Sequence, residues 1–110
     1  MYTILLLQIE IRGIPADEKV EWTRTVDDNG FNPVWNDTKC FTVTCPDLAL
    51  VSFRVMDNDR FAFDSMVAEY SLPMRCMQTG YRMIGLRDRR GHAVGLTSLF
   101  VHVSIDKSSA

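Results

Sequence analysis

The stretch "ALVSFRVMDND", residues 49–59, alternates apolar and polar side chains and then ends in carboxylates. Its apolar residues stand at every second position: Ala49, Val51, Phe53 and Val55. Successive side chains of a β-strand point to opposite faces, so this period of two predicts a strand with one buried face. The strand runs directly into Asp57 and Asp59, which places two carboxylates at one end of the predicted sheet.

The same strand-like composition recurs along the chain and predicts an all-β protein. Six more segments are bounded by turn residues: 5–11, 20–26, 41–45, 65–72, 81–86 and 99–105. About seven short strands with turn signals between them are typical of an antiparallel sandwich. We therefore expect a Greek-key β-sandwich of about seven to eight strands. It would form one domain over residues 1–106, with a disordered tail at 107–110.

Composition excludes several classes of protein. The net charge of -2 gives no general basic field that would attract nucleic acid. Cys40, Cys45 and Cys76 form no Cys-x-x-Cys pair, so neither a disulfide framework nor a zinc site is predicted. Reduced thiols in a cytoplasmic protein are expected. The apolar run near the N-terminus is too short to span a membrane and lacks the features of a signal peptide.

Carboxylates are expected to gather at one end of the sheet. Successive loops of an antiparallel sheet alternate between its two ends, which puts loops 27–36, 57–64 and 87–95 together. Hard cations such as calcium take oxygen ligands from flexible loops. The candidate metal ligands are Asp28, Asp57, Asp59 and Asp64. The alternative is that they are solvated turn residues, because Asp is common in turns. An EF-hand is excluded, since Ala62 and Ala68 replace its required Gly and Glu.

The same end carries candidate membrane contacts. Phe61 and Phe63 stand at a loop tip, where exposed aromatics can enter a bilayer interface. Arg87, Arg89 and Arg90 could meet anionic lipid headgroups. The alternatives are that the two rings fold back on the sandwich and that the arginines form a solvated hairpin tip.

Signals for catalysis are weak. The sequence has no Gly-x-Ser-x-Gly elbow, no phosphate-binding glycine loop and no His-Glu-x-x-His motif. His92 and His102 have no metal-type partner nearby in sequence, and His102 is expected to be a surface or edge residue of its strand. We expect no catalytic residues in this chain.

Five segments, in order along the chain, resemble the C2 (C-two) domain of phosphoinositide-specific phospholipase C. They are "IRGIPAD" (11–17), "DDNGFNPVWN" (27–36), "CPDLALVSFRV" (45–55), "MQTGYRMIGL" (77–86) and "TSLFVHVSI" (97–105). The resemblance implies that residues 27–36 are the second calcium loop of that domain. Phe31 and Trp35 would anchor this loop in the sandwich and leave Asp28 near the ion. Asp57 and Asp59 match the paired aspartates of the third calcium loop.

The resemblance implies a calcium- and phospholipid-binding module that docks an enzyme on membrane. The enzyme would hydrolyse phosphatidylinositol bisphosphate to diacylglycerol and inositol trisphosphate in signal transduction. Calcium is the implied cofactor, and the implied partners are an anionic phospholipid membrane and the catalytic barrel of the parent enzyme. The location would be cytoplasmic and peripheral at the membrane.

The chain departs from the family pattern in ways that leave a second function open. The first strand and first calcium loop of the family have no counterpart here, and Ala68 stands where glycine is usual. A missing strand leaves a sheet edge unpaired unless residues 2–7 cover it. The catalytic barrel is also absent, so this chain alone is not expected to be an enzyme. The alternative is a calcium-independent interaction or structural module that packs on the barrel or on other partners.

Overall fold

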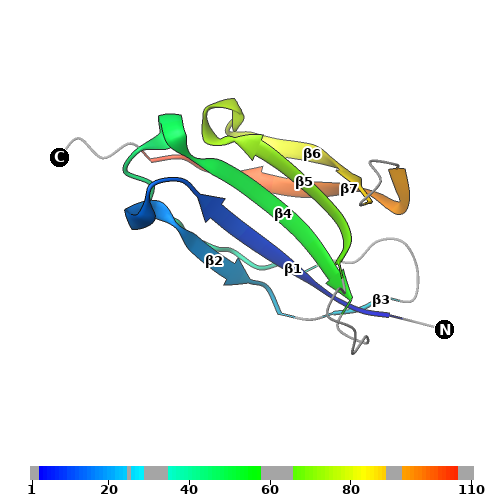
Figure 1. Cartoon of the computed structure of the whole chain (residues 1–110). Coiled ribbons are helices and arrows are strands. Elements are labelled where there is room, and N and C mark those ends of the chain that lie inside the picture. Colours follow the sequence, from blue (N-terminus) through cyan, green and yellow to red (C-terminus); the bar gives the residue numbers. More distant parts are fainter. Residues whose placement is uncertain (1–2, 25, 29–34, 58–65, 89–92, 107–110) are drawn as a thin grey trace.

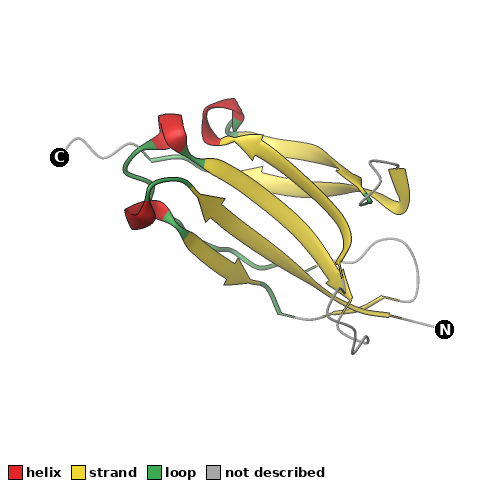
Figure 2. Cartoon of the chain, in the orientation of Figure 1, coloured by secondary structure: helices red, strands yellow, loops and turns green. Residues whose placement is uncertain are grey.

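The computed structural model describes residues 3–24, 26–28, 35–57, 66–88 and 93–106, and these form antiparallel strands with three short 3-10 helices (Figure 1). The strands are β1 (Thr3–Arg12), β2 (Lys19–Trp22), β3 (Val26–Asp28), β4 (Leu50–Asp57), β5 (Met66–Pro73), β6 (Gly80–Arg87) and β7 (Ala93–Val103). The helices are η1 (Pro15–Asp17), η2 (Pro46–Leu48) and η3 (Met74–Cys76). Figure 2 shows the helices together at one end of the strands.

All described strands belong to one sheet, in the order β2-β1-β4-β5-β6-β7, and β3 also pairs with β1. A single register pair, Glu69 with Arg87, joins β5 to β6. Beyond this narrow junction β6 and β7 fold back over the face of β1 and β4, so the sheet is curled. The predicted all-β antiparallel fold is confirmed. The described strands nevertheless form one continuous sheet instead of two separate ones, because the β5–β6 pair keeps its halves connected.

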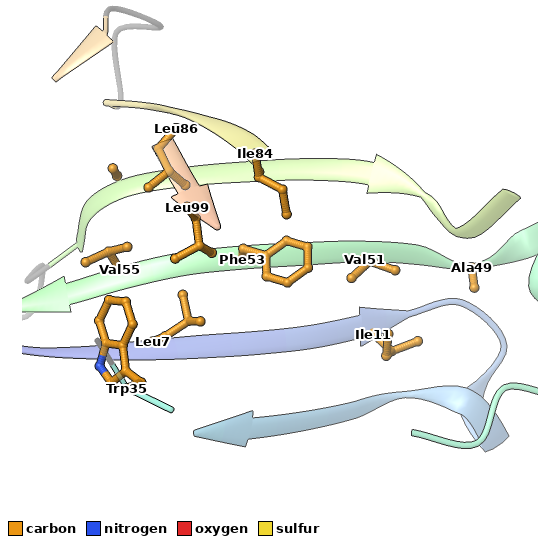
Figure 3. Packing of buried hydrophobic residues seen from close by; sticks show 11 residues of the cluster. Leu7, Ile11, Trp35, Ala49, Val51, Phe53, Val55, Ile84, Leu86 and Leu99 are labelled. Atoms are coloured by element: carbon orange, nitrogen blue, oxygen red, sulfur yellow. The ribbon is translucent and has the colours of Figure 1, made fainter. Parts of the chain in front are cut away.

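The core lies on the concave face, where the alternating residues of β1 and β4 meet. Leu7 pairs with Val55 and Ile11 with Val51, and all four side chains are buried. Phe53 lies between the two valines, and Figure 3 shows these residues pointing to the same side as Leu99 of β7 (Figure 3). Full burial of each such side chain stabilises the fold by about 1.5–3 kcal/mol. The strand predicted from residues 49–59 is therefore confirmed, with its apolar face inward.

The opposite face of the same strands is polar and centred on Arg54. Its Nη1 donates to Glu10 Oε1 at 2.7 Å and to Gln8 Oε1 at 3.1 Å, and its Nε donates to Glu69 Oε2 at 3.1 Å. Partial burial disfavours the charged guanidinium, but the hydrogen bonds to Glu10 and Glu69 outweigh it and raise the pKa of Arg54. The outer face of strands β1, β4 and β5 is therefore polar, and hydrogen bonds of Arg54 connect the three strands.

One open alternative about strands is decided, and one expectation is wrong. Residues 3–7 do not cover an open edge, because they lie inside the sheet as part of β1, between β3 and β4. Residues 41–45, expected as a strand, join no ladder of the described residues. Phe41 and Val43 do pack on the core. The backbone N–H groups of Thr44 and Cys45 donate to the Asp17 carboxylate instead of to a neighbouring strand.

Asp17 fixes this segment to the turn after β1. The side chain is only 2% exposed, and it accepts bonds from Thr44 N–H at 2.8 Å, Thr44 Oγ1 at 2.9 Å and Cys45 N–H at 2.9 Å. The Thr44 backbone bond holds the pKa of Asp17 below its usual value, against the opposing effect of burial. The bonds require an ionised carboxylate that accepts from three donors.

We expect Asp17→Asn to lower stability at neutral pH and to reduce its acid dependence. A carboxyl group with a lowered folded pKa contributes fully above its unfolded pKa, and its contribution is lost as pH falls through the folded pKa. The free energy of unfolding would be measured in urea at pH 7 and at pH 3. The difference between wild type and variant should be far larger at pH 7 than at pH 3. Asp47→Asn, at an exposed residue on η2, is the control. An equal difference at both pH values would contradict the role of the charge.

Gly13 allows the turn after β1 to pass close to η2. A Cβ at this position would lie 3.0 Å from the carbonyl oxygen of Leu48 and 3.2 Å from the Cα of Ala49. Both neighbours are backbone atoms, so neither can move without shifting the chain. This contact holds the turn after β1 against η2, at the end of the sheet that lies away from the candidate site.

Gly13→Ala should therefore destabilise the protein by about 1–3 kcal/mol, the usual cost of overpacking. Denaturant titration followed by tryptophan fluorescence measures the change. Gly85→Ala is the matched control, because a Cβ there meets no atom within 4 Å. The explanation fails if both variants unfold at the same midpoint.

Candidate calcium and membrane site

The strands place the expected site residues at one end of the sheet. Strands β3, β4 and β6 end there, β5 and β7 begin there, and the three 3-10 helices lie at the opposite end (Figure 1). Antiparallel pairing produces this arrangement, because β2, β3 and β4 all run opposite to β1, β5 runs opposite to β4, and β7 runs opposite to β6. The described strand ends agree with the expectation that the three candidate loops leave the sheet together.

Asp28 and Asp57 end two strands that flank β1 on opposite sides. Asp28 is paired with Thr3, and Asp57 with Leu5. Neighbouring strands lie about 4.8 Å apart, so strands on either side of a third are separated by roughly 10 Å. The two aspartates therefore lead into loops on either side of β1, on strands at that spacing and offset by two register positions along β1. Their carboxylate oxygens are the ligand type that calcium prefers.

Most other predicted site residues lie outside the described part of the chain. These are the candidate ligands Asp59 and Asp64 and the candidate membrane contacts Phe61, Phe63, Arg89 and Arg90. Arg87 is described: it is exposed at the end of β6, in register with Glu69 and Ala93. Among the described residues, no three His, Cys, Asp or Glu side chains are grouped to hold a metal. The structure therefore gives the backbone positions of Asp28 and Asp57, and their role as metal ligands stays a prediction.

Trp35 connects the expected second calcium loop to the core. Its side chain is buried, and Figure 3 shows it lying over Leu7. Its carbonyl oxygen accepts a 2.8 Å hydrogen bond from Arg24 Nε. The anchoring role that the resemblance implied for Trp35 is confirmed, whereas Phe31 lies outside the described residues. One end of this loop is therefore held by packing and by the arginine.

An exposed apolar patch on β6 and β7 was missed by the sequence analysis. Tyr81, Met83 and Phe100 are 68%, 65% and 64% exposed, and we call these three residues the β6–β7 patch. The rings of Tyr81 and Phe100 are stacked with centroids 5.4 Å apart. His102, exposed as expected, contacts Tyr81 at 4.6 Å between ring centroids. The sequence did hold a signal for this patch, because apolar residues occupy both faces of the strand at 81–86. Only one of the two faces can be buried in the core.

None of the described helices is long and apolar enough to cross a membrane. Cys40, Cys45 and Cys76 are free cysteines in this structure.

Comparison with known proteins gives the family. Residues 5–89 match the model of the C2 domain. The chain is 39% identical over 104 residues to a 1-phosphatidylinositol 4,5-bisphosphate phosphodiesterase delta-4 of Xenopus laevis, covering 94% of this chain and 14% of that protein. It is 41% identical over 97 residues to inactive phospholipase C-like protein 2 of Mus musculus, covering 88% of this chain and 8% of the relative.

Solved structures show the same similarity in three dimensions. PLC21 of L. pealei superposes with a TM-score of 0.77 at 30% identity, over 91% of this chain and 13% of that one. PLC21 of S. officinalis gives 0.73 at 25% identity, over 96% and 14%. The chain thus spans about one seventh of the length of these structures. The family match over residues 5–89 and the strands that it covers show that this chain belongs to the C2 domain family.

Proposed function

We propose that this chain is a calcium- and phospholipid-binding module that docks a phospholipase C-like protein on membrane. The observation that carries the proposal is the position of Asp28 and Asp57, which lead into loops on either side of β1 at one end of a C2-family sheet. The protein would be cytoplasmic and peripheral at the membrane. Its parent would be a phosphoinositide phospholipase C that hydrolyses phosphatidylinositol bisphosphate, with catalysis carried out outside this chain.

The proposed site uses different residues for the ion and for the lipid. Calcium would be held by carboxylates of Asp28, Asp57, Asp59 and Asp64, and when bound it would supply positive charge for lipid phosphates. The side chains of Phe61 and Phe63 would enter the bilayer interface, because aromatic rings are stable at that depth. Arg87, Arg89 and Arg90 would contact anionic headgroups, each contributing about 1 kcal/mol.

The similarity to inactive phospholipase C-like proteins fits a docking role. A module that acts through membrane binding has a use in a protein that lacks catalysis, whereas a catalytic element does not. In the intact parent, the curled sheet described here would be completed to the Greek-key sandwich.

Calcium should raise the thermal midpoint of the purified chain, because a ligand that binds only the folded state stabilises it. At a concentration 100 times the dissociation constant the gain is about 2.7 kcal/mol. Asp57→Asn should remove most of the shift. Asp47→Asn is the control, since Asp47 lies on η2 at the opposite end and pairs with Arg75.

Sedimentation with vesicles of phosphatidylserine and phosphatidylcholine tests the lipid half of the proposal. Calcium should move wild type and Asp47→Asn into the vesicle pellet, and Asp57→Asn should stay in solution. Identical thermal midpoints with calcium and with chelator would reject the calcium site.

A second function, a calcium-independent protein-interaction module, is favoured by the β6–β7 patch. Exposed stacked rings are costly to leave in water, and contiguous apolar surface commonly marks an interaction site. The polar network around Arg54 covers β1, β4 and β5, whereas the patch lies on β6 and β7. The proposed partner is the catalytic barrel of a phospholipase C-like parent.

The double variant Tyr81→Ser/Phe100→Ser should weaken binding to a separately expressed barrel by tenfold or more, because buried aromatic anchors contribute on the order of 1–2 kcal/mol each. Calorimetric titration in chelator measures the affinity. Trp22→Ser, which removes a half-exposed ring from β2, is the control. Both variants should unfold near the wild-type midpoint, since exposed substitutions change stability by about 0.5 kcal/mol. Unchanged binding by the double variant would exclude the patch as the contact.

A further inference from the structure

Arg24 connects the two ends of the expected second calcium loop, residues 27–36. It lies between β2 and β3, on the entry side of the loop. Its Nε donates to the carbonyl oxygen of Trp35 at 2.8 Å, and its backbone N–H donates to Asp37 Oδ2 at 3.3 Å. One residue on the entry side therefore contacts two residues on the exit side. We call these two hydrogen bonds the Arg24 clamp.

The backbone of Arg24 is held by its buried neighbour Thr23. The Thr23 N–H donates to the carbonyl oxygen of Leu7 at 2.9 Å, and the Leu7 N–H donates to Thr23 Oγ1 at 2.9 Å. The same hydroxyl donates to the carbonyl oxygen of Arg24 at 3.0 Å. Leu7 belongs to the buried core on β1. The clamp is therefore attached to a rigid part of the sheet.

The clamp binds on both sides of a residue in the left-handed conformation. Among the described residues, Asn36 is the only residue other than glycine with a positive φ, at 48°. Asparagine adopts this conformation more readily than most residues, but still at a cost in free energy. Such a conformation persists where surrounding contacts hold it. The clamp supplies these contacts at Trp35, just before Asn36, and at Asp37, just after it.

The strand that carries the candidate ligand Asp28 is short. Strand β3 has three residues, and three register pairs join it to β1. Asp28 is its last residue, and the ends of strands are the first places where pairing opens. The position of Asp28 relative to Asp57, on the other side of β1, should therefore depend on how the loop is closed at its base.

We propose that Arg24 is a positioning residue for the calcium site, because it closes the base of residues 27–36 and so holds the backbone that carries Asp28. The inference rests on the proposed calcium function. Arg24 acts through its hydrogen bond to Trp35 and not through its charge. A positive charge near a cation site opposes calcium, so an effect of charge would make a neutral substitute bind calcium more tightly.

Two neutral variants separate the hydrogen bond from the charge. In Arg24→Gln, the amide nitrogen stands at the same place along the side chain as Nε of arginine, so a donor to the Trp35 carbonyl is kept. Arg24→Met places a methyl group there instead. Arg82→Met is the matched control, because it removes a comparable bond at the start of β6, from Nη2 to the carbonyl oxygen of Thr79 at 2.9 Å.

Calorimetric titration of the whole chain with calcium chloride measures the affinity. Arg24→Met should weaken calcium binding by about tenfold, the usual effect of losing a residue that orients a metal ligand. Arg24→Gln and Arg82→Met should bind calcium as wild type does. In chelator, urea unfolding should show similar losses of stability for the two Met variants, because each loses one side-chain bond to a carbonyl oxygen.

Acrylamide quenching of Trp35 fluorescence tests the clamp without calcium. The chain has two tryptophans, so Trp35 is the only one left in a Trp22→Phe background. In chelator, Arg24→Met should raise the quenching constant of Trp35 by about twofold or more, because local opening exposes the ring. Arg24→Gln and Arg82→Met should leave the quenching constant unchanged.

Three results would overturn the inference. They are unchanged quenching in Arg24→Met, calcium affinity of Arg24→Met equal to that of wild type, and tighter calcium binding by both neutral Arg24 variants. A different result would reject the proposed calcium function itself: wild type binds no calcium, although Arg24→Met raises the quenching. The effect on calcium affinity would then be rejected too, and the hold of Arg24 on the loop would be supported.

Discussion

The antiparallel pairing of β1 with β4 is the constraint on which the rest of the structure depends. It is an eight-pair ladder from Leu5–Asp57 to Arg12–Leu50, and every other strand is attached directly or in series to one of its members. One face of this ladder supplies the buried residues of the core. The other face supplies the charged network of Arg54. Because the side chains of a strand alternate, one register decides both surfaces, and a slip of one residue would exchange them.

The same ladder sets where function can reside. It ends at Asp57, and β3 reaches Asp28 on the other side of β1, so the candidate ligands follow from strand pairing and not from a local motif. Strand ends combine a rigid support with loops that adapt to a ligand, which suits an ion that accepts flexible coordination. The opposite end is closed by Gly13 and Asp17, whose close contacts fix the short helices.

Strands β6 and β7 are connected to the rest of the sheet less extensively than the other strands. One residue pair, Glu69 with Arg87, joins the two halves of the sheet. The last strand of the described sheet, β7, and the exposed β6–β7 patch lie in this half. These features describe a domain whose surface is suited to contacts with other polypeptides. This agrees with relatives in which the matched region is a small part of a much longer chain.

The sequence by itself determined the all-β class, the inner face of β4 and the position of most strands, because period-two alternation depends only on which side chains prefer water. It also identified the family and the anchoring residue Trp35, since these depend on motifs that are continuous in sequence. Tertiary structure alone decided that residues 41–45 join no ladder of the described residues, and that the buried carboxylate of Asp17 binds the backbone donors of Thr44 and Cys45. It alone decided that Tyr81 and Phe100 remain exposed, because residues that are apolar on both faces of a strand do not reveal which face finds a covering layer. Burial and hydrogen-bond partners are properties of residues distant in sequence, and only the fold brings these together.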